Sequence, residues 1–104
     1  MENSKLHIIS VETARTLTLK QIISDMENDP MFKDFYAEYI GNIKRKIYES
    51  IRDGYVSFIL EGERGQLPGK VEALLLLQGY QIIRRDENSF YINFIDINNT
   101  YHNL

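Results

Sequence analysis

A long stripe of apolar side chains between residues 31 and 52 constrains the fold of this chain more than any other feature. Its members recur every three or four positions, which is the spacing of one face of an α-helix: Phe32, Tyr36, Ile40, Ile43, Ile47 and Ile51. Phe35 and Tyr39 widen the stripe. The pattern predicts a helix from Met31 to Arg52. We expect it to end at Asp53-Gly54, because glycine adopts the left-handed conformation that closes helices without steric cost.

A strand is expected directly after this helix. Residues Tyr55 to Leu60 are rich in β-branched and aromatic side chains, and Val56, Phe58 and Leu60 would share one strand face. The helical stripe and this strand face are the two largest apolar surfaces, so we expect them to cover each other. The core would then place Ile43, Ile47 and Ile51 against Val56, Phe58, Leu74 and Phe94.

Shorter patterns complete the set of elements. Residues 10–29 fit either one helix that starts at Ser10 or two, the second starting at Thr18, before Pro30 breaks the pattern. Pro68 can open another helix, which Gly79 would cap and whose apolar positions are Val71, Leu74, Leu75 and Leu77. Tyr80 to Arg85 and Phe90 to Ile95 have strand composition, and the polar turn at 86–89 predicts an antiparallel hairpin.

The resulting order, α(α)-α-β-α-β-β, predicts an α+β fold with helices packed on one face of a small three-stranded sheet. A chain of 104 residues can bury one core, so residues 1–104 are expected to form a single domain, frayed at 1–9 and 97–104. Two sheet arrangements stay open. The first strand either has a parallel neighbour, reached by a right-handed crossover, or the sheet is wholly antiparallel.

Composition limits the functional classes. With 12 Lys and Arg against 15 Asp and Glu, the net charge of −3 disfavours nucleic acid as a partner. The absence of Cys excludes disulfides and thiolate zinc sites and suits a cytoplasmic location. The longest apolar run, Ala73 to Leu77, is far shorter than the roughly 20 residues of a membrane-spanning helix, so no membrane association is expected.

Catalytic, metal and cofactor signatures are missing from the sequence. The two histidines, His7 and His102, lie near opposite ends of the chain, which is no metal-ligand spacing. No serine lies in a strand–turn–helix nucleophile motif. We therefore expect a protein that is not an enzyme, with no catalytic residues, no metal and no cofactor.

The glycine-containing segment from Gly62 to Lys70 raises the possibility of anion binding, because a helix N-terminus can receive a phosphate. It departs from a P-loop, since Val71 follows Lys70 and since Glu61 and Glu63 would repel phosphate. An ordinary strand-to-helix loop is the simpler interpretation. The alternative is a small-ligand, nucleotide-like binding or sequestering protein that uses Arg64, Lys70, Arg84 and Arg85. Arg84 and Arg85 would lie on opposite strand faces.

The long helix carries the candidate partner-binding surface. Lys44, Arg45 and Lys46 lie between Ile43 and Ile47, so we expect their side chains to point away from the core. A solvated helix face is the simpler interpretation, and a surface for an acidic partner is the alternative. The aromatic stripe is wider than three strands can cover, and leftover apolar surface commonly marks an interface. The candidate partner-binding residues are Phe35, Tyr39, Lys44, Arg45 and Lys46.

Several segments together resemble a loose pattern of small accessory proteins of tailed bacteriophages. The matching pieces are Ile43 to Ile51, Asp53-Gly54-Tyr55-Val56, Val71 to Leu77, Gly79-Tyr80-Gln81-Ile82 and Tyr91-Ile92-Asn93-Phe94. The resemblance covers most of the chain and implies a phage-encoded protein of the host cytoplasm. With the missing catalytic signatures, it leads us to expect a non-enzymatic interaction protein that acts through protein–protein binding or self-assembly, as a homo-oligomer.

Overall fold

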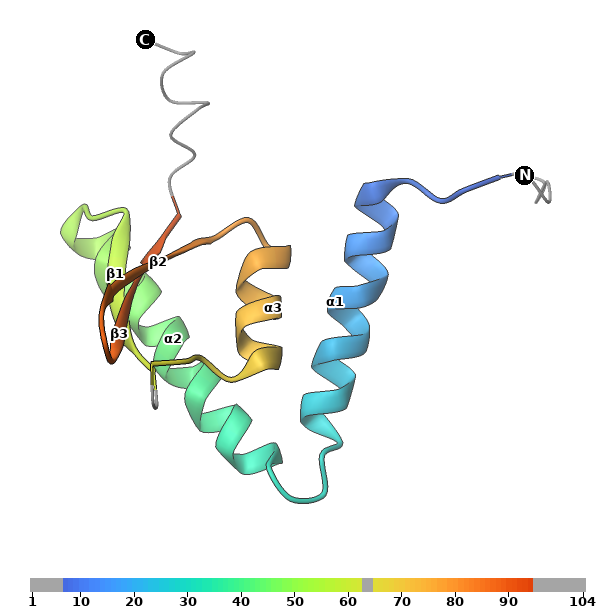
Figure 1. Cartoon of the computed structure of the whole chain (residues 1–104), viewed down its shortest axis with the longest axis horizontal. Helices are drawn as coiled ribbons and strands as arrows, with labels where there is room; N and C mark the ends of the chain where they lie inside the picture. Colours follow the sequence, from blue (N-terminus) through green and yellow to red (C-terminus); the bar gives the residue numbers. More distant parts are fainter. Residues whose placement is uncertain (1–6, 63–64, 95–104) are drawn as a thin grey trace, which may run out of the picture.

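The computed structural model describes residues 7–62 and 65–94. They form an α+β fold in which a three-stranded sheet is combined with three helices (Figure 1), and this confirms the expected fold class and element order. The elements are α1 (Val11–Glu27), α2 (Lys33–Asp53), β1 (Ser57–Glu61), α3 (Gly69–Leu77), β2 (Gln81–Asp86) and β3 (Ser89–Asn93). The residues expected to fray at the chain ends lie mostly outside the described part.

The first helical segment is one helix rather than two. Ser10 is its N-cap, as predicted, and its hydroxyl oxygen accepts a hydrogen bond from the Thr13 backbone N–H at 3.1 Å. The backbone N–H of Asn28 closes the last turn on the Ser24 carbonyl oxygen. Met26 is the one buried side chain of α1, so most of this helix is exposed to solvent.

The long helix α2 begins two residues later than the sequence pattern predicts. The Asp29 carboxylate accepts hydrogen bonds from the backbone N–H groups of Met31 and Phe32, at 2.8 and 2.7 Å. These bonds hold residues 30–32 in a turn, which delays the helix to Lys33. Its end was predicted correctly: Gly54 takes the left-handed conformation, with φ of 80°, and closes α2.

The sheet is wholly antiparallel, which settles the alternative that the sequence left open. Its strand order is β1-β3-β2, so β3 lies between the two strands that precede it in the chain. Phe58 pairs with Ile92 and Leu60 pairs with Phe90 across β1 and β3, while Ile82 of β2 pairs with Ile92. The predicted hairpin of β2 and β3 is confirmed.

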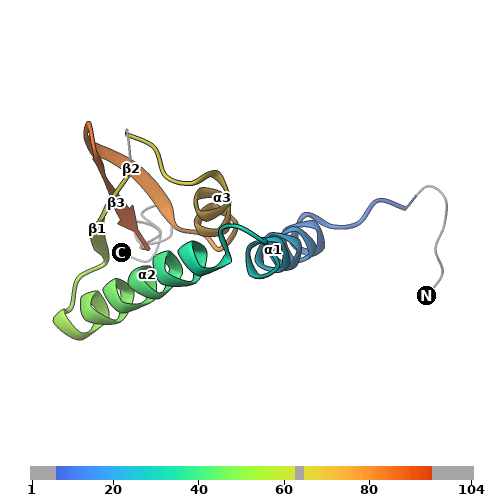
Figure 2. The same ribbon diagram turned by 90° about the horizontal axis from the view of Figure 1, so that it is seen from below.

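The core lies between the sheet and the two helices α2 and α3. Figure 2 shows α2 running beneath the sheet, with α3 beside it and α1 farther away. The helix α1 packs against α2 and α3, so it forms an outer layer and does not cover the sheet as the other two do. The core residues are Ile43, Phe58, Leu60, Leu67, Val71, Leu75, Phe90 and Ile92, with Ile47 and Phe94 half-buried against them.

Two residues expected in the core are exposed instead. Ile51 is 56% exposed because it lies in the last turn of α2, and Val56 is 44% exposed because it precedes the first ladder residue of β1, Ser57. The Val56 carbonyl oxygen accepts the Phe94 N–H, so Val56 still fixes the end of the sheet through its backbone. Leu74 is buried as expected, but it lies outside the cluster around Phe58 and borders a cavity next to α1.

Candidate functional site

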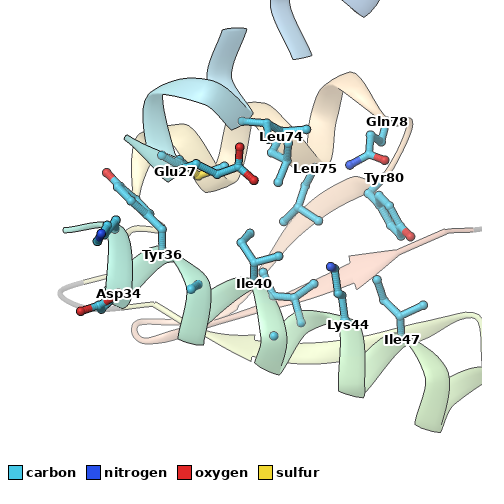
Figure 3. Close-up of a pocket in the computed structure, with 16 residues that line it drawn as sticks. Glu27, Asp34, Tyr36, Ile40, Lys44, Ile47, Leu74, Leu75, Gln78 and Tyr80 are labelled. Atoms are coloured by element: carbon cyan, nitrogen blue, oxygen red, sulfur yellow. The ribbon is translucent and has the colours of Figure 1, made fainter. Parts of the chain in front are cut away.

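An open cavity of about 690 Å³ lies between the three helices. We call it the three-helix cavity (Figure 3). Most of its wall is apolar. The lining residues are Ile23, Met26 and Glu27 of α1; Lys33, Asp34, Tyr36, Ala37, Ile40, Gly41, Ile43, Lys44 and Ile47 of α2; Leu74 and Leu75 of α3; and Gln78 and Tyr80 after α3.

The long helix and the short helix supply facing apolar walls. Figure 3 shows Ile40 and Ile47 rising from α2 toward Leu74 and Leu75 of α3. Two tyrosines, Tyr36 and Tyr80, stand at opposite ends of the opening. Positions 36, 40 and 47 belong to the stripe that predicted α2, so the cavity uses the part of this stripe that the sheet leaves uncovered.

Two small residues keep the α2 side of the cavity open. Ala37 and Gly41 are one helical turn apart and both line it. A Cβ atom added at Gly41 would meet no heavy atom within 4 Å, so the space above this residue is free of protein atoms. A larger side chain at either position would project into the cavity.

Charged side chains lie at both ends of the cavity. In Figure 3, Glu27 projects over the opening at the end near Tyr36, whereas Lys44 projects from α2 toward α3 at the end near Tyr80. In the described part of the chain, neither Glu27 nor Lys44 forms an ion pair. Both are therefore available to a ligand or partner that enters the cavity.

Lys44 is exposed and lies outside the core cluster, in agreement with the expectation that it points away from the core, and it also lines the open cavity. It follows Ile40 by four positions and precedes Ile47 by three, which places all three on one helix face. Arg45 lies on the outside of the helix as expected. Its guanidinium donates to Glu49 at 2.9 Å and to Asn42 at 2.7 Å.

The two aromatic candidates on α2 have different environments. Phe35 is about half exposed, and its ring lies 5.5 Å from that of Tyr36 and 5.6 Å from that of Tyr39. The Tyr39 hydroxyl donates to the Glu61 carbonyl oxygen at 3.1 Å, and burial raises the pKa of this phenol. Tyr39 thus fastens α2 to the end of β1, whereas Phe35 keeps about half of its surface exposed to solvent. Lys46 is partly buried.

The arginines considered for ligand binding lie on opposite faces of the sheet, as the sequence predicts. Arg84 donates to the Gly65 carbonyl oxygen at 2.8 Å and stacks over the buried Phe90 ring, at 5.3 Å from its centre. Arg85 lies on the other face, where it pairs with Asp86 at 2.9 Å. Their guanidinium groups therefore do not converge on one ligand.

The other two ligand candidates do not complete such a site among the described residues. Lys70 lies at the start of α3 with its ammonium 5.9 Å from the centre of the Tyr36 ring, and Arg64 lies outside the described residues. None of Lys70, Arg84 and Arg85 lines the three-helix cavity.

Gly62, at the start of this loop, has a packing role. A Cβ at Gly62 would come within 2.7 Å of both the Gln66 carbonyl oxygen and the Phe90 ring, which only glycine avoids.

The sequence did not predict that residues from distant segments line one cavity together. These residues are Ile23, Met26, Glu27, Leu75, Gln78 and Tyr80. One signal was present in the sequence. Gly41 interrupts a strong helical pattern without ending it, and an internal helical glycine often marks a packing or functional requirement.

Comparison of the chain with protein-family models, curated proteins and solved structures gave no match. Within residues 7–62 and 65–94, no three His, Cys, Asp or Glu side chains gather as metal ligands would. No helix in the same residues has the length and apolar character to span a membrane.

Proposed function

We propose that this protein is a non-enzymatic interaction protein whose three-helix cavity binds an amphipathic helix of a protein partner. The observation that carries the proposal is the cavity itself, with a volume of about 690 Å³ and apolar walls from three separate helices. Open apolar surface of this extent on a small domain commonly marks a binding site.

The length of the cavity along α2 matches a helix of about four turns. Its lining on α2 runs from Lys33 to Ile47, which at about 1.5 Å per residue corresponds to about 21 Å, or four helical turns. An amphipathic helix that lies in an apolar groove presents anchors at positions i, i+3, i+4 and i+7, and these fit a groove of this length.

The charged residues of the cavity indicate which charges the partner helix should carry. An acidic side chain of the partner would pair with Lys44 near the Tyr80 end, and a basic one would pair with Glu27 near the Tyr36 end. Such charges fix the direction of the bound helix more than they add affinity.

The weak attachment of α1 supports the same function. Only Met26 of its 17 residues is buried. A helix of this length is marginal in water unless tertiary contacts support it. A partner helix that contacts Ile23 and Met26 from the cavity would give α1 the packing that it lacks in the chain alone.

The test is affinity capture with three versions of the protein. Gly41→Trp should fill the cavity, whereas Gly41→Ala is the matched control because its methyl group meets no neighbour. Proteins retained by the unmodified chain and by Gly41→Ala should be lost with Gly41→Trp. Lys44→Glu should weaken the same interactions. If a folded Gly41→Trp protein retains the same partners, the cavity is not the binding site.

The phage-encoded origin and the cytoplasmic location stay predictions from the sequence, and the cavity proposal does not depend on them.

A further inference from the structure

The chain leaves the described part of the structure next to the three-helix cavity. Phe94 is the last described residue, and its ring lies 6.2 Å from the ring of Tyr80, which lines the cavity. The Phe94 backbone N–H donates to the Val56 carbonyl oxygen at 2.9 Å and so holds this point of the chain against the sheet. Residues 95–104 therefore start beside the Tyr80 end of the cavity.

These residues are numerous enough to cross the cavity. In an extended conformation, at about 3.3 Å per residue, residues 95–104 span about 33 Å. The cavity lining on α2 runs over about 21 Å. About six or seven residues therefore suffice to reach the Tyr36 end from the Tyr80 end.

We propose that residues 95–104 bind in the three-helix cavity of their own chain and compete there with the partner helix. The proposal rests on the proposed function, because both require that this cavity is a binding site. Residues 98–100, Asn-Asn-Thr, have low helix propensity, so the segment binds as extended chain. The apolar side chains that contact the cavity walls are Ile95, Ile97, Tyr101 and Leu104.

Asp96 supplies the charge that the near end of the cavity lacks. It is two positions beyond Phe94, and hence within about 7 Å of it along the chain. Figure 3 shows Lys44 projecting toward α3 at this same end, and Lys44 has no ion pair among the described residues. Asp96 pairs with Lys44 and fixes where the segment enters the cavity.

His102 matches the far end of the cavity. It follows Asp96 by six positions, which at about 3.3 Å per residue is about 20 Å and so about the length of the cavity. Glu27, Asp34 and Lys33 line that end, and an imidazole N–H of His102 can donate to the Glu27 carboxylate. The segment thus carries its acidic and basic groups in the order that the cavity favours for a partner.

Covalent attachment favours the segment of the same chain over any free copy of it. A short tether gives a bound group an effective concentration in the millimolar range, so even weak contacts suffice for binding. The partner helix must displace the segment, which lowers its apparent affinity by the fraction of chains in which the cavity is occupied.

The test is paramagnetic NMR of the full chain in the absence of any partner. The sequence contains no Cys, so Asn103→Cys provides a single site for a nitroxide label. The label should broaden the amide signal of Ala37, in the cavity, more than that of Gly54, which lies about 26 Å away along α2. A segment that does not bind stays tethered near Val56 and would broaden Gly54 at least as strongly.

Charge variants test the pairing of Asp96 with Lys44. Lys44→Glu should reduce the broadening at Ala37 about twofold or more, because it places like charges together. Addition of Asp96→Lys to Lys44→Glu should restore the broadening. Lys20→Glu is the matched control, because Lys20 is an exposed residue of α1 that does not line the cavity.

A mixture of two chains shows which copy the segment binds. Isotope-labelled chain without nitroxide, mixed with nitroxide-bearing chain without isotope, should show no broadening at Ala37. Broadening in the mixture would mean that the segment binds a second copy, and this would overturn the proposal, as would equal broadening of Ala37 and Gly54 in the doubly labelled chain. The capture experiment with Gly41→Trp does not depend on either result, so failure of this proposal is distinguishable from failure of the proposed function.

Discussion

At the scale of single residues, glycines in this chain have opposite roles that the backbone distinguishes. Gly54 closes α2 with φ of 80°, whereas Gly41 lies in the middle of the same helix and lines the cavity. The first role could be predicted from the sequence, because Asp-Gly follows a helical stripe. For the second, the sequence offered only the presence of a glycine inside a helical pattern, since the empty space above Gly41 depends on where α1 and α3 lie.

Substitution of these two glycines by alanine should have opposite effects on stability. Gly41→Ala should raise the free energy of unfolding by about 0.5–1 kcal/mol, because alanine favours helix and its Cβ meets nothing within 4 Å. Gly54→Ala should lower it by about 1 kcal/mol, because alanine is strained at positive φ. Denaturant titration measures both, and the same sign for the two would contradict this assignment.

Asp29 gives the turn between α1 and α2 a pH dependence. Hydrogen bonds from the backbone N–H groups of Phe32 and Met31 lower the pKa of its carboxyl below 3.8. A lowered folded-state pKa means that the stabilisation is complete above the unfolded pKa and is lost as the pH falls through the folded pKa. Carboxyl carbon NMR should show a midpoint for Asp29 below 3.8. A midpoint at or above that value would contradict the capping role.

At the scale of elements, sequence patterns predicted the structures that depend on residues close together in the chain. The helix α2, its end and the β2–β3 hairpin each depend on neighbouring residues, and all three are confirmed. The position of β3 between β1 and β2 was not predictable, because pairing between distant strands leaves no local pattern. The errors at Ile51 and Val56 have a similar cause. Composition indicated apolar character there, but the sheet begins only at Ser57.

Two isoleucines on α2 test this boundary between core and surface. Ile43 is 3% exposed and packs in the core, so Ile43→Ala should cost about 2–5 kcal/mol in the free energy of unfolding. Ile51 is mostly exposed, and Ile51→Ala should cost less than about 1 kcal/mol. Urea unfolding of the two variants gives the comparison. Equal losses would mean that α2 extends the core farther than its exposure indicates.

At the scale of the whole molecule, the proposed binding surface arises from an imbalance between the helices and the sheet. The width of the apolar stripe on α2 indicated that three strands could not cover all of it. The presence of leftover apolar surface on α2 was therefore predictable from the sequence. The cavity was not, because it requires α1, α3 and Tyr80 to meet over the part of the stripe that the sheet leaves uncovered.

The central claim is that the three-helix cavity is where a partner binds, and its most direct test is a dissociation constant. Calorimetric titration of a purified captured partner should give the same affinity for the unmodified chain, for Gly41→Ala and for Ile83→Lys, because Ile83 is an exposed residue of β2 that does not line the cavity. The affinity of Gly41→Trp should fall by about tenfold or more, because its side chain occupies the space that the partner helix needs. If Gly41→Trp binds as tightly as the unmodified chain, or if Ile83→Lys is the variant that fails, the partner does not bind in the three-helix cavity.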